Sequence, residues 1–120
     1  MAKLLLVEDD TFLIDIYSTK LKENGYEIFV VSDGEQVLPK MEEVNPDIVL
    51  LDIVLPGMDG WEILRKIRQN EKFNDTKVVI LSNLGQKNEI DKGIKLGATK
   101  YLIKAHYTPS EVVEEIKKVT

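Results

Sequence analysis

The sequence predicts an α/β fold in which a parallel sheet of five strands carries helices on both faces. Apolar runs of strand length alternate with segments whose apolar residues recur at helical spacing. The strand-length runs are apolar throughout, as expected where both faces of a sheet are covered. Five such strand–helix units follow one another along 120 residues, so we expect residues 1–120 to form one domain.

The elements are expected in the following order. Strands are predicted over residues 4–7, 28–31, 48–51, 78–81 and 101–103. Helices are predicted between and after them, over residues 12–21, 37–41, 61–67, 90–96 and 108–119. Asn24-Gly25 and Gly97 mark helix ends, and Pro109 fits an early position in the last helix. Pro39 lies inside the second helix, where it should produce a kink or a short helix.

Composition excludes several classes of protein. The chain has no cysteine, which excludes disulfides and thiolate metal sites and agrees with a reducing compartment such as the cytoplasm. The apolar run that ends before Glu8 is too short for a signal peptide or a membrane span. A formal net charge of −5 disfavours binding to nucleic acid through a basic face. We therefore expect a cytoplasmic domain without direct membrane or nucleic-acid contacts.

Polar residues follow four of the five expected strands: Glu8-Asp9-Asp10, Asp52, Ser82-Asn83 and Lys104. The second strand, which ends near Ser32-Asp33, offers nothing distinctive. Ligands of such sheets bind at the carboxyl ends of the strands, near the point where the strand order reverses. If the order is 2-1-3-4-5, the first and third strands are neighbours, and their carboxylates converge on one point.

Converging carboxylates need a cation or a shared proton. Two carboxylates about 4 Å apart repel by roughly 4 kcal/mol at an effective dielectric constant near 20. Their hard oxygen atoms suit Mg²⁺, which binds one or two carboxylates together with water and phosphate oxygens. Lys104 would add a positive charge and Ser82 a hydroxyl, so the group could stabilise a phosphoryl group in transfer. Asp52 could itself be the nucleophile, forming an aspartyl phosphate.

Each residue also has a purely structural interpretation. Asp10 beside Thr11 is typical of a helix cap, and Ser82 alone is more often a turn residue. A lysine after an edge strand is usually a solvated charge. His106, the only histidine, is expected in a surface loop. Asp52 is the hardest to explain structurally, because a carboxylate directly after four apolar residues lies close to the core.

Over essentially its whole length the chain resembles the receiver domains of two-component response regulators. Glu8-Asp9 is similar to the acidic pair of that family, and Asp52, Pro56 and Gly60 match its Asp-x-x-x-Pro-x-x-x-Gly pattern. The resemblance implies a flavodoxin-like (βα)5 fold, and the strand order 2-1-3-4-5 rests on it. It also implies that Asp52 is the phosphoacceptor.

The resemblance implies further roles. Asp9 would bind Mg²⁺ directly and Glu8 through water, with Asp52 and the backbone carbonyl of Val54 completing the protein ligands. Ser82 would bond a phosphoryl oxygen, and Lys104 corresponds to the lysine of the motif. Tyr101 matches the aromatic residue that moves inward when Ser82 engages the phosphate.

The resemblance implies a switch rather than an enzyme with turnover, with only self-catalysed phosphoryl transfer and slow autodephosphorylation. The phosphoryl donor would be a histidine kinase or a phosphotransfer protein. A downstream protein partner would bind the face formed by the fourth helix, fifth strand and fifth helix. The chain could be a free-standing, chemotaxis-regulator-like domain or a fragment of a larger regulator.

The sequence departs from the family next to this pocket. Ala105 stands where the family usually has a proline in a cis peptide, and Asn83 where a small residue is common. A cis bond before a non-proline residue costs about 2.5–4 kcal/mol, so the loop either keeps that strain or takes another path.

The sequence bears on three alternatives to the switch. A pseudo-receiver that signals without phosphate is kept as an alternative because of Ala105. An aspartyl-phosphate phosphatase is disfavoured, because Asp9-Asp10-Thr11 lacks an Asp-x-Asp arrangement. A nucleotide-binding fold is disfavoured by the lack of glycine after the first strand.

Overall fold

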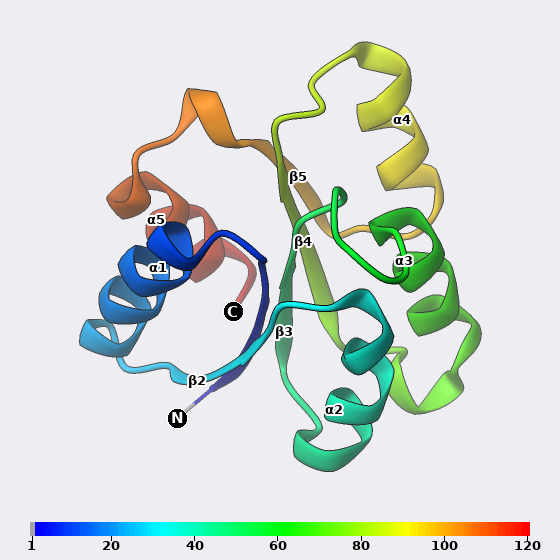
Figure 1. The fold of residues 1–120 in the computed structure, drawn as a ribbon, viewed down its shortest axis with the longest axis horizontal. Coiled ribbons are helices and arrows are strands. Elements are labelled where there is room, and N and C mark those ends of the chain that lie inside the picture. The colour runs from blue at the N-terminus through cyan, green and yellow to red at the C-terminus, as the bar shows by residue number, and fades with distance from the viewer. Residues whose placement is uncertain (1) are drawn as a thin grey trace.

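The computed structural model describes residues 2–120. Its centre is a parallel sheet with the order β2-β1-β3-β4-β5 (Figure 1). The strands are β1 (Lys3–Val7), β2 (Glu27–Val31), β3 (Ile48–Leu51), β4 (Lys77–Ser82) and β5 (Lys100–Ile103). All four neighbouring pairs are parallel, so the predicted flavodoxin-like sheet and its order are confirmed.

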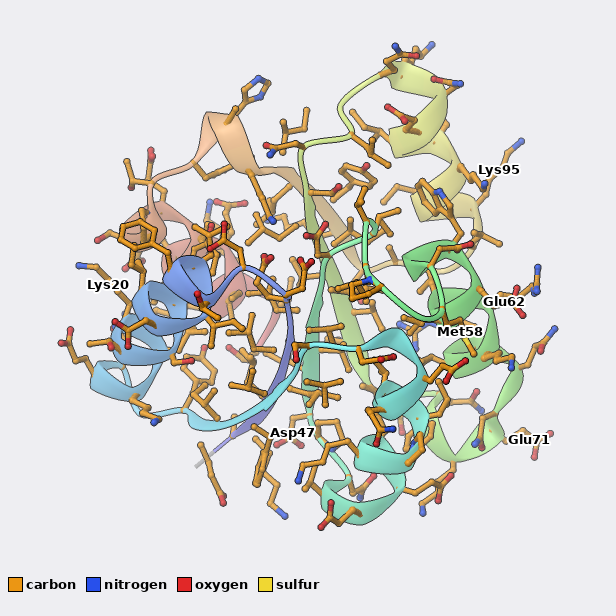
Figure 2. All side chains as sticks on the ribbon, in the orientation of Figure 1. Lys20, Asp47, Met58, Glu62, Glu71 and Lys95 are labelled. Atoms are coloured by element: carbon orange, nitrogen blue, oxygen red, sulfur yellow. The ribbon has the colours of Figure 1, made fainter. Side chains whose placement is uncertain are left out.

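Helices cover both faces of the sheet. They are α1 (Thr11–Glu23), α2 (Val37–Val44), α3 (Gly60–Gln69), α4 (Lys87–Lys95) and α5 (Pro109–Val119). Helices α1 and α5 lie on one face, and α2, α3 and α4 on the other (Figure 1). Charged side chains such as Glu71 and Lys95 point away from the sheet into solvent (Figure 2). No helix within residues 2–120 has both the length and the apolar character needed to cross a membrane.

The core forms two layers, one on each side of the sheet. Along β1, Leu4 and Leu6 pack toward α1 and α5, whereas Leu5 and Val7 pack toward the helices on the other face. Side chains of a strand alternate between faces, so a strand covered on both faces needs apolar residues at every position. This explains the uninterrupted apolar runs of the sequence.

Pro39 does not interrupt a helix. A 3₁₀ turn, η1 (Gly34–Gln36), precedes α2, which starts only at Val37 and spans eight residues. Pro39 therefore lies in the first turn of α2, where backbone N–H groups have no partner within the helix and a missing donor costs little. The expected short helix is confirmed, and the first turn accommodates the proline.

The strand register brings the polar ends of the strands to one edge of the sheet. Val7 of β1 pairs with Leu51 of β3, so the residues that follow them, Glu8 and Asp52, emerge side by side. Backbone hydrogen bonds continue this alignment, because the amide of Asp52 donates to the Val7 carbonyl at 3.0 Å. On the other side of β3, Ser82 pairs with Ile103, and Lys104 follows directly.

Candidate functional site

The structure brings together the three carboxylates that the sequence analysis singled out. One oxygen from each of Glu8, Asp9 and Asp52 lies within 4.8 Å of the others. Glu8 and Asp52 are only 2% and 7% exposed, whereas Asp9 is exposed to solvent. Asp10 points elsewhere, since its side chain accepts from the amides of Phe12 and Leu13 and caps α1. Its predicted role as a helix cap is confirmed.

Lys104 lies between the two buried carboxylates. Its Nζ is 2.8 Å from Oε1 of Glu8 and 2.9 Å from Oδ2 of Asp52. Burial alone would lower the pKa of Lys104, but the hydrogen bonds and charges of Glu8 and Asp52 outweigh burial and raise that pKa above its usual value. The lysine is therefore a fixed positive charge at the centre of the cluster.

The loop after Lys104 takes a different path from the one that a cis peptide would give. No peptide bond among residues 2–120 is cis, so the bond from Lys104 to Ala105 is trans, as expected before a residue other than proline. Residues 104–106 form a 3₁₀ turn, η3 (Lys104–His106), in which His106 is exposed. Lys104 nevertheless reaches Asp52 with this loop conformation.

Ser82 and Tyr101 meet at the backbone of Leu84. The buried Oγ of Ser82 accepts from the amide of Leu84 at 3.2 Å, and the hydroxyl of Tyr101 donates to the carbonyl of the same residue. Burial, together with the charges of Glu89 and Asp52, raises the pKa of the Tyr101 hydroxyl. The loop between β4 and α4 is thus held by one side chain from β4 and one from β5.

Val54 lies at the mouth of the cluster. Val54 is 62% exposed, and its amide donates to Oδ1 of Asp52 at 3.3 Å. Asp52 is consequently contacted from two directions, by Val54 through one oxygen and by Lys104 through the other.

Comparison with known proteins decides the family. A family model described as "Response regulator receiver domain" matches residues 4–117. The chain belongs to this family. The resemblance inferred from the sequence motifs is confirmed, and membership places this receiver domain in phosphorylation-dependent two-component signalling.

Two curated relatives are longer than this chain. The alkaline phosphatase synthesis transcriptional regulatory protein PhoP of Bacillus subtilis is 34% identical over 119 residues, which cover 98% of this chain and 48% of that protein. Transcriptional regulatory protein BaeR of Escherichia coli is 36% identical, with 98% and 47% covered. The chain therefore spans about half the length of these curated relatives.

Solved structures share the fold over nearly the full chain. Chemotaxis protein CheY4 of Vibrio cholerae has a TM-score of 0.92 and 27% identity, with 100% of this chain and 99% of that chain covered. The Mn²⁺-bound form of response regulator Rcp1 has a TM-score of 0.86 and 26% identity, with 98% and 93% covered.

The residues of the receiver domain fit a hard divalent cation. Three carboxylates face one ammonium group, that of Lys104, so the cluster keeps a net negative charge. Oxygen atoms of carboxylates are the donors that Mg²⁺ and Mn²⁺ prefer. Asp9 is exposed, so the cluster is open to solvent at this residue.

The burial of Glu8 predicts that the stability of the metal-free protein depends on pH. Burial, reinforced by Asp52, raises the pKa of Glu8 above its ordinary value of 4.5. A carboxyl with a raised folded-state pKa contributes stability that is fully present below its unfolded-state pKa and is lost as the pH rises through the folded-state pKa. In EDTA, the variant Glu8→Gln should therefore be more stable than the parent near neutral pH, with a difference that shrinks toward pH 4.5.

Urea unfolding of both proteins across this pH range measures the effect. Lys104 keeps Asp52 as a partner in the variant, so no buried charge is left alone. A variant that is less stable than the parent at every pH would contradict this electrostatic account. Addition of Mg²⁺ should reverse the order, because the ion stabilises the ionised parent by binding its folded state.

The turn after β2, whose sequence offers nothing distinctive, contacts the loop that follows Asp52. The amide of Gly34, in the turn after β2, donates to the carbonyl of Pro56 in the loop that carries Val54. The Asp33-Gly34 pair marks a turn in sequence, but the loop against which it packs is visible only in the tertiary structure.

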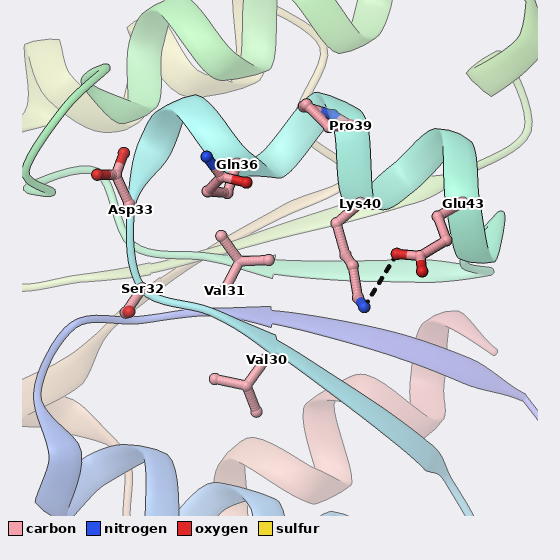
Figure 3. A pocket seen from close by; sticks show the side chains of 8 residues that line it. All are labelled: Val30, Val31, Ser32, Asp33, Gln36, Pro39, Lys40 and Glu43. Atoms are coloured by element: carbon pink, nitrogen blue, oxygen red, sulfur yellow. Dashed lines mark ion pairs between the residues drawn. The ribbon is translucent and has the colours of Figure 1, made fainter.

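A groove lies beside the same strand and includes none of the clustered carboxylates. It is lined by Val30, Val31, Ser32, Asp33, Gln36, Pro39, Lys40 and Glu43 (Figure 3).

Proposed function

We propose that residues 1–120 act as one receiver domain, a switch that accepts a phosphoryl group on Asp52 from a histidine kinase or a phosphotransfer protein. The observation that carries this proposal is the arrangement around Asp52. Its carboxylate is almost buried, contacts Lys104 at 2.9 Å and lies within the acidic cluster of Glu8 and Asp9.

In the proposed transfer, an oxygen of the ionised Asp52 carboxylate attacks the phosphorus of a phosphohistidine. The new P–O bond forms as the P–N bond breaks, and the electron pair of the P–N bond returns to the imidazole nitrogen of the donor. Lys104 and Ser82 lie at the ends of neighbouring strands and would stabilise the charge on the phosphoryl oxygens. Attack by water later releases phosphate and restores the carboxylate.

The acidic cluster would hold Mg²⁺ for this transfer. Asp9 and Asp52 would bind the ion directly, Glu8 would act through water, and the carbonyl of Val54 would complete the protein ligands. When bound, the ion supplies positive charge that neutralises the phosphoryl oxygens. In the metal-free protein, Lys104 balances part of the charge of Glu8 and Asp52.

Phosphorylation would be read out through Leu84. The acyl phosphate carries about −1.5 to −2 charge and would draw Ser82 away from its bond with the Leu84 amide, which is 3.2 Å long. Tyr101 donates to the carbonyl of Leu84, so its packing would change with the loop. The surface of α4, β5 and α5 would then favour a downstream protein, as a shift between two packings of one domain.

Backbone amide NMR in the presence of Mg²⁺ and trifluoroberyllate, a phosphoryl mimic, tests this proposal. We expect shifts at Asp52, Ser82, Leu84 and Tyr101 and along α4, and no such shifts in the variant Asp52→Asn. Shifts restricted to the acidic cluster would instead support the alternative of a pseudo-receiver that interacts with proteins independently of phosphate. A spectrum unchanged by Mg²⁺ and trifluoroberyllate would contradict both the metal site and the switch.

A further inference from the structure

We infer that the turn after β2, residues 32–36, is a positioning element of the Asp52 site, because it fixes the loop of residues 52–59 that carries Val54. This inference rests on the proposed function, since it concerns the ligand that Val54 would give to Mg²⁺. Figure 3 shows Asp33 beyond the end of β2, at the start of the turn that leads into α2.

Gly34 binds the loop through its backbone. Its amide donates to the carbonyl of Pro56 at 3.0 Å. A Cβ at this position would overlap the carbonyl oxygen of Met58 and lie 2.8 Å from the carbonyl carbon of that residue. The contact is therefore backbone against backbone, and any side chain at Gly34 must displace the loop.

Gly57 makes the reciprocal contact from the side of the loop. Its φ of +82° lies in the region that favours glycine, and a Cβ there would overlap Oδ1 of Asp33. The same oxygen accepts from the amide of Glu35 at 2.8 Å, which orients the carboxylate. Two glycines, one on each segment, thus allow the turn and the loop to touch.

The contact matters for Asp52 because the loop leads directly to it. Val54, two residues after Asp52, donates its amide to Oδ1 of Asp52 at 3.3 Å, while its own side chain is largely exposed and packs little. The position of the Val54 backbone is therefore set by its neighbours in the loop, which are anchored at the buried Ile53 on one side and at the contact of Pro56 and Met58 with Gly34 on the other. Displacement of the loop would move a metal ligand without changing any ligand residue.

The test compares two glycine variants. Gly34→Ala should weaken Mg²⁺ binding by about tenfold to hundredfold, the usual cost of losing support behind a metal ligand. Gly25→Ala is the matched control, because Gly25 has a φ of +90° but no atom within 4 Å of an added Cβ and lies in the turn before β2. It should lower the free energy of unfolding while leaving the affinity for Mg²⁺ unchanged. Isothermal titration calorimetry with Mg²⁺ gives the affinities, and urea unfolding gives the stabilities.

Variants of Asp33 make a second test that does not require the Gly34 variant to fold. Asp33→Ala removes the carboxylate that orients the turn and should weaken Mg²⁺ binding, whereas Asp33→Asn keeps an acceptor for the amide of Glu35 and should restore it. Parental Mg²⁺ affinity in folded Gly34→Ala, or in Asp33→Ala, would overturn the inference. An equal loss of affinity in Gly25→Ala would also overturn it, because the effect would then follow from stability alone.

Amide NMR of the metal-free variants separates this inference from the proposed function. Changes in the amide chemical shifts of residues 52–59 in Gly34→Ala, without such changes in Gly25→Ala, would support the inference that the turn positions the loop. If the parent protein binds no Mg²⁺ while these shifts occur, the proposed metal site fails and the structural part of the inference stands. Unshifted amides in this loop would contradict the inference directly.

Discussion

Replacing Lys104 with methionine is expected to lower the free energy of unfolding of the metal-free protein by about 3–5 kcal/mol, the usual cost of removing one partner of a buried ion pair. The side chain of Lys104 is only 12% exposed, and those of its partners Glu8 and Asp52 are 2% and 8% exposed. Without the ammonium group, two buried carboxylates face each other with no cation between them. Urea unfolding in EDTA, followed by the fluorescence of Trp61, measures the loss.

Three comparisons identify the cause of this loss. Lys118→Met removes a largely exposed ammonium group from Glu115, which keeps Lys100 as a partner, and should cost no more than about 1 kcal/mol. Adding Asp52→Asn to Lys104→Met removes one of the two repelling charges and should recover much of the stability. Mg²⁺ should also recover part of it by supplying a cation. A Lys104→Met protein as stable as the parent, or one that neither Mg²⁺ nor Asp52→Asn rescues, would contradict the electrostatic description of the site.

Removal of Mg²⁺ is expected to slow phosphorylation by acetyl phosphate by at least about a hundredfold. A metal ion at a phosphoryl group contributes several kcal/mol of charge stabilisation, and each 1.4 kcal/mol or so changes a rate tenfold. Within residues 2–120, Lys104 supplies the single ammonium group that forms ion pairs with the carboxylates of Glu8 and Asp52. Its one positive charge cannot replace the two positive charges of Mg²⁺. Rates in EDTA and in excess Mg²⁺, measured by intact mass against time, give the ratio.

Matched ionic strength is the necessary control, because salt alone changes the encounter of a charged donor with an acidic protein. The rate in EDTA with added KCl should stay low, and Mn²⁺ should restore it, since Mn²⁺ also prefers oxygen ligands. Similar rates with and without a divalent cation would show that the acidic cluster does not serve phosphoryl transfer.

The sheet was predictable from sequence because its signals are local. The strands are apolar runs, which in the central strands β1, β3 and β4 follow from burial on both faces, and several helix ends carry a local signal such as Asn24-Gly25 or Thr108. The strand order came from the family resemblance. Once that order is given, the register of Val7 with Leu51 brings Glu8 next to Asp52.

The remaining parts of the site depend on tertiary packing and could not be predicted. The trans bond after Lys104 agrees with the intrinsic preference of a non-proline peptide, but only the structure shows that η3 still lets Lys104 reach Asp52. Gly34 and Met58 are 24 residues apart in the sequence, and nothing in either segment indicates that their backbones touch. Pro39 was expected to bend or shorten the second helix, and the structure shows that it lies in the first turn of α2, where a missing donor costs little.

The most direct test of the central claim is the mass of the protein after incubation with acetyl phosphate and Mg²⁺. The parent should gain one phosphoryl group, and borohydride reduction followed by peptide mapping should place it on Asp52. Asp52→Asn should gain none, while Asp9→Asn, which keeps the acceptor, should be phosphorylated more slowly. A parent that is never modified, or an Asp52→Asn protein that gains the group as readily as the parent, would contradict the assignment of Asp52 as the phosphoacceptor.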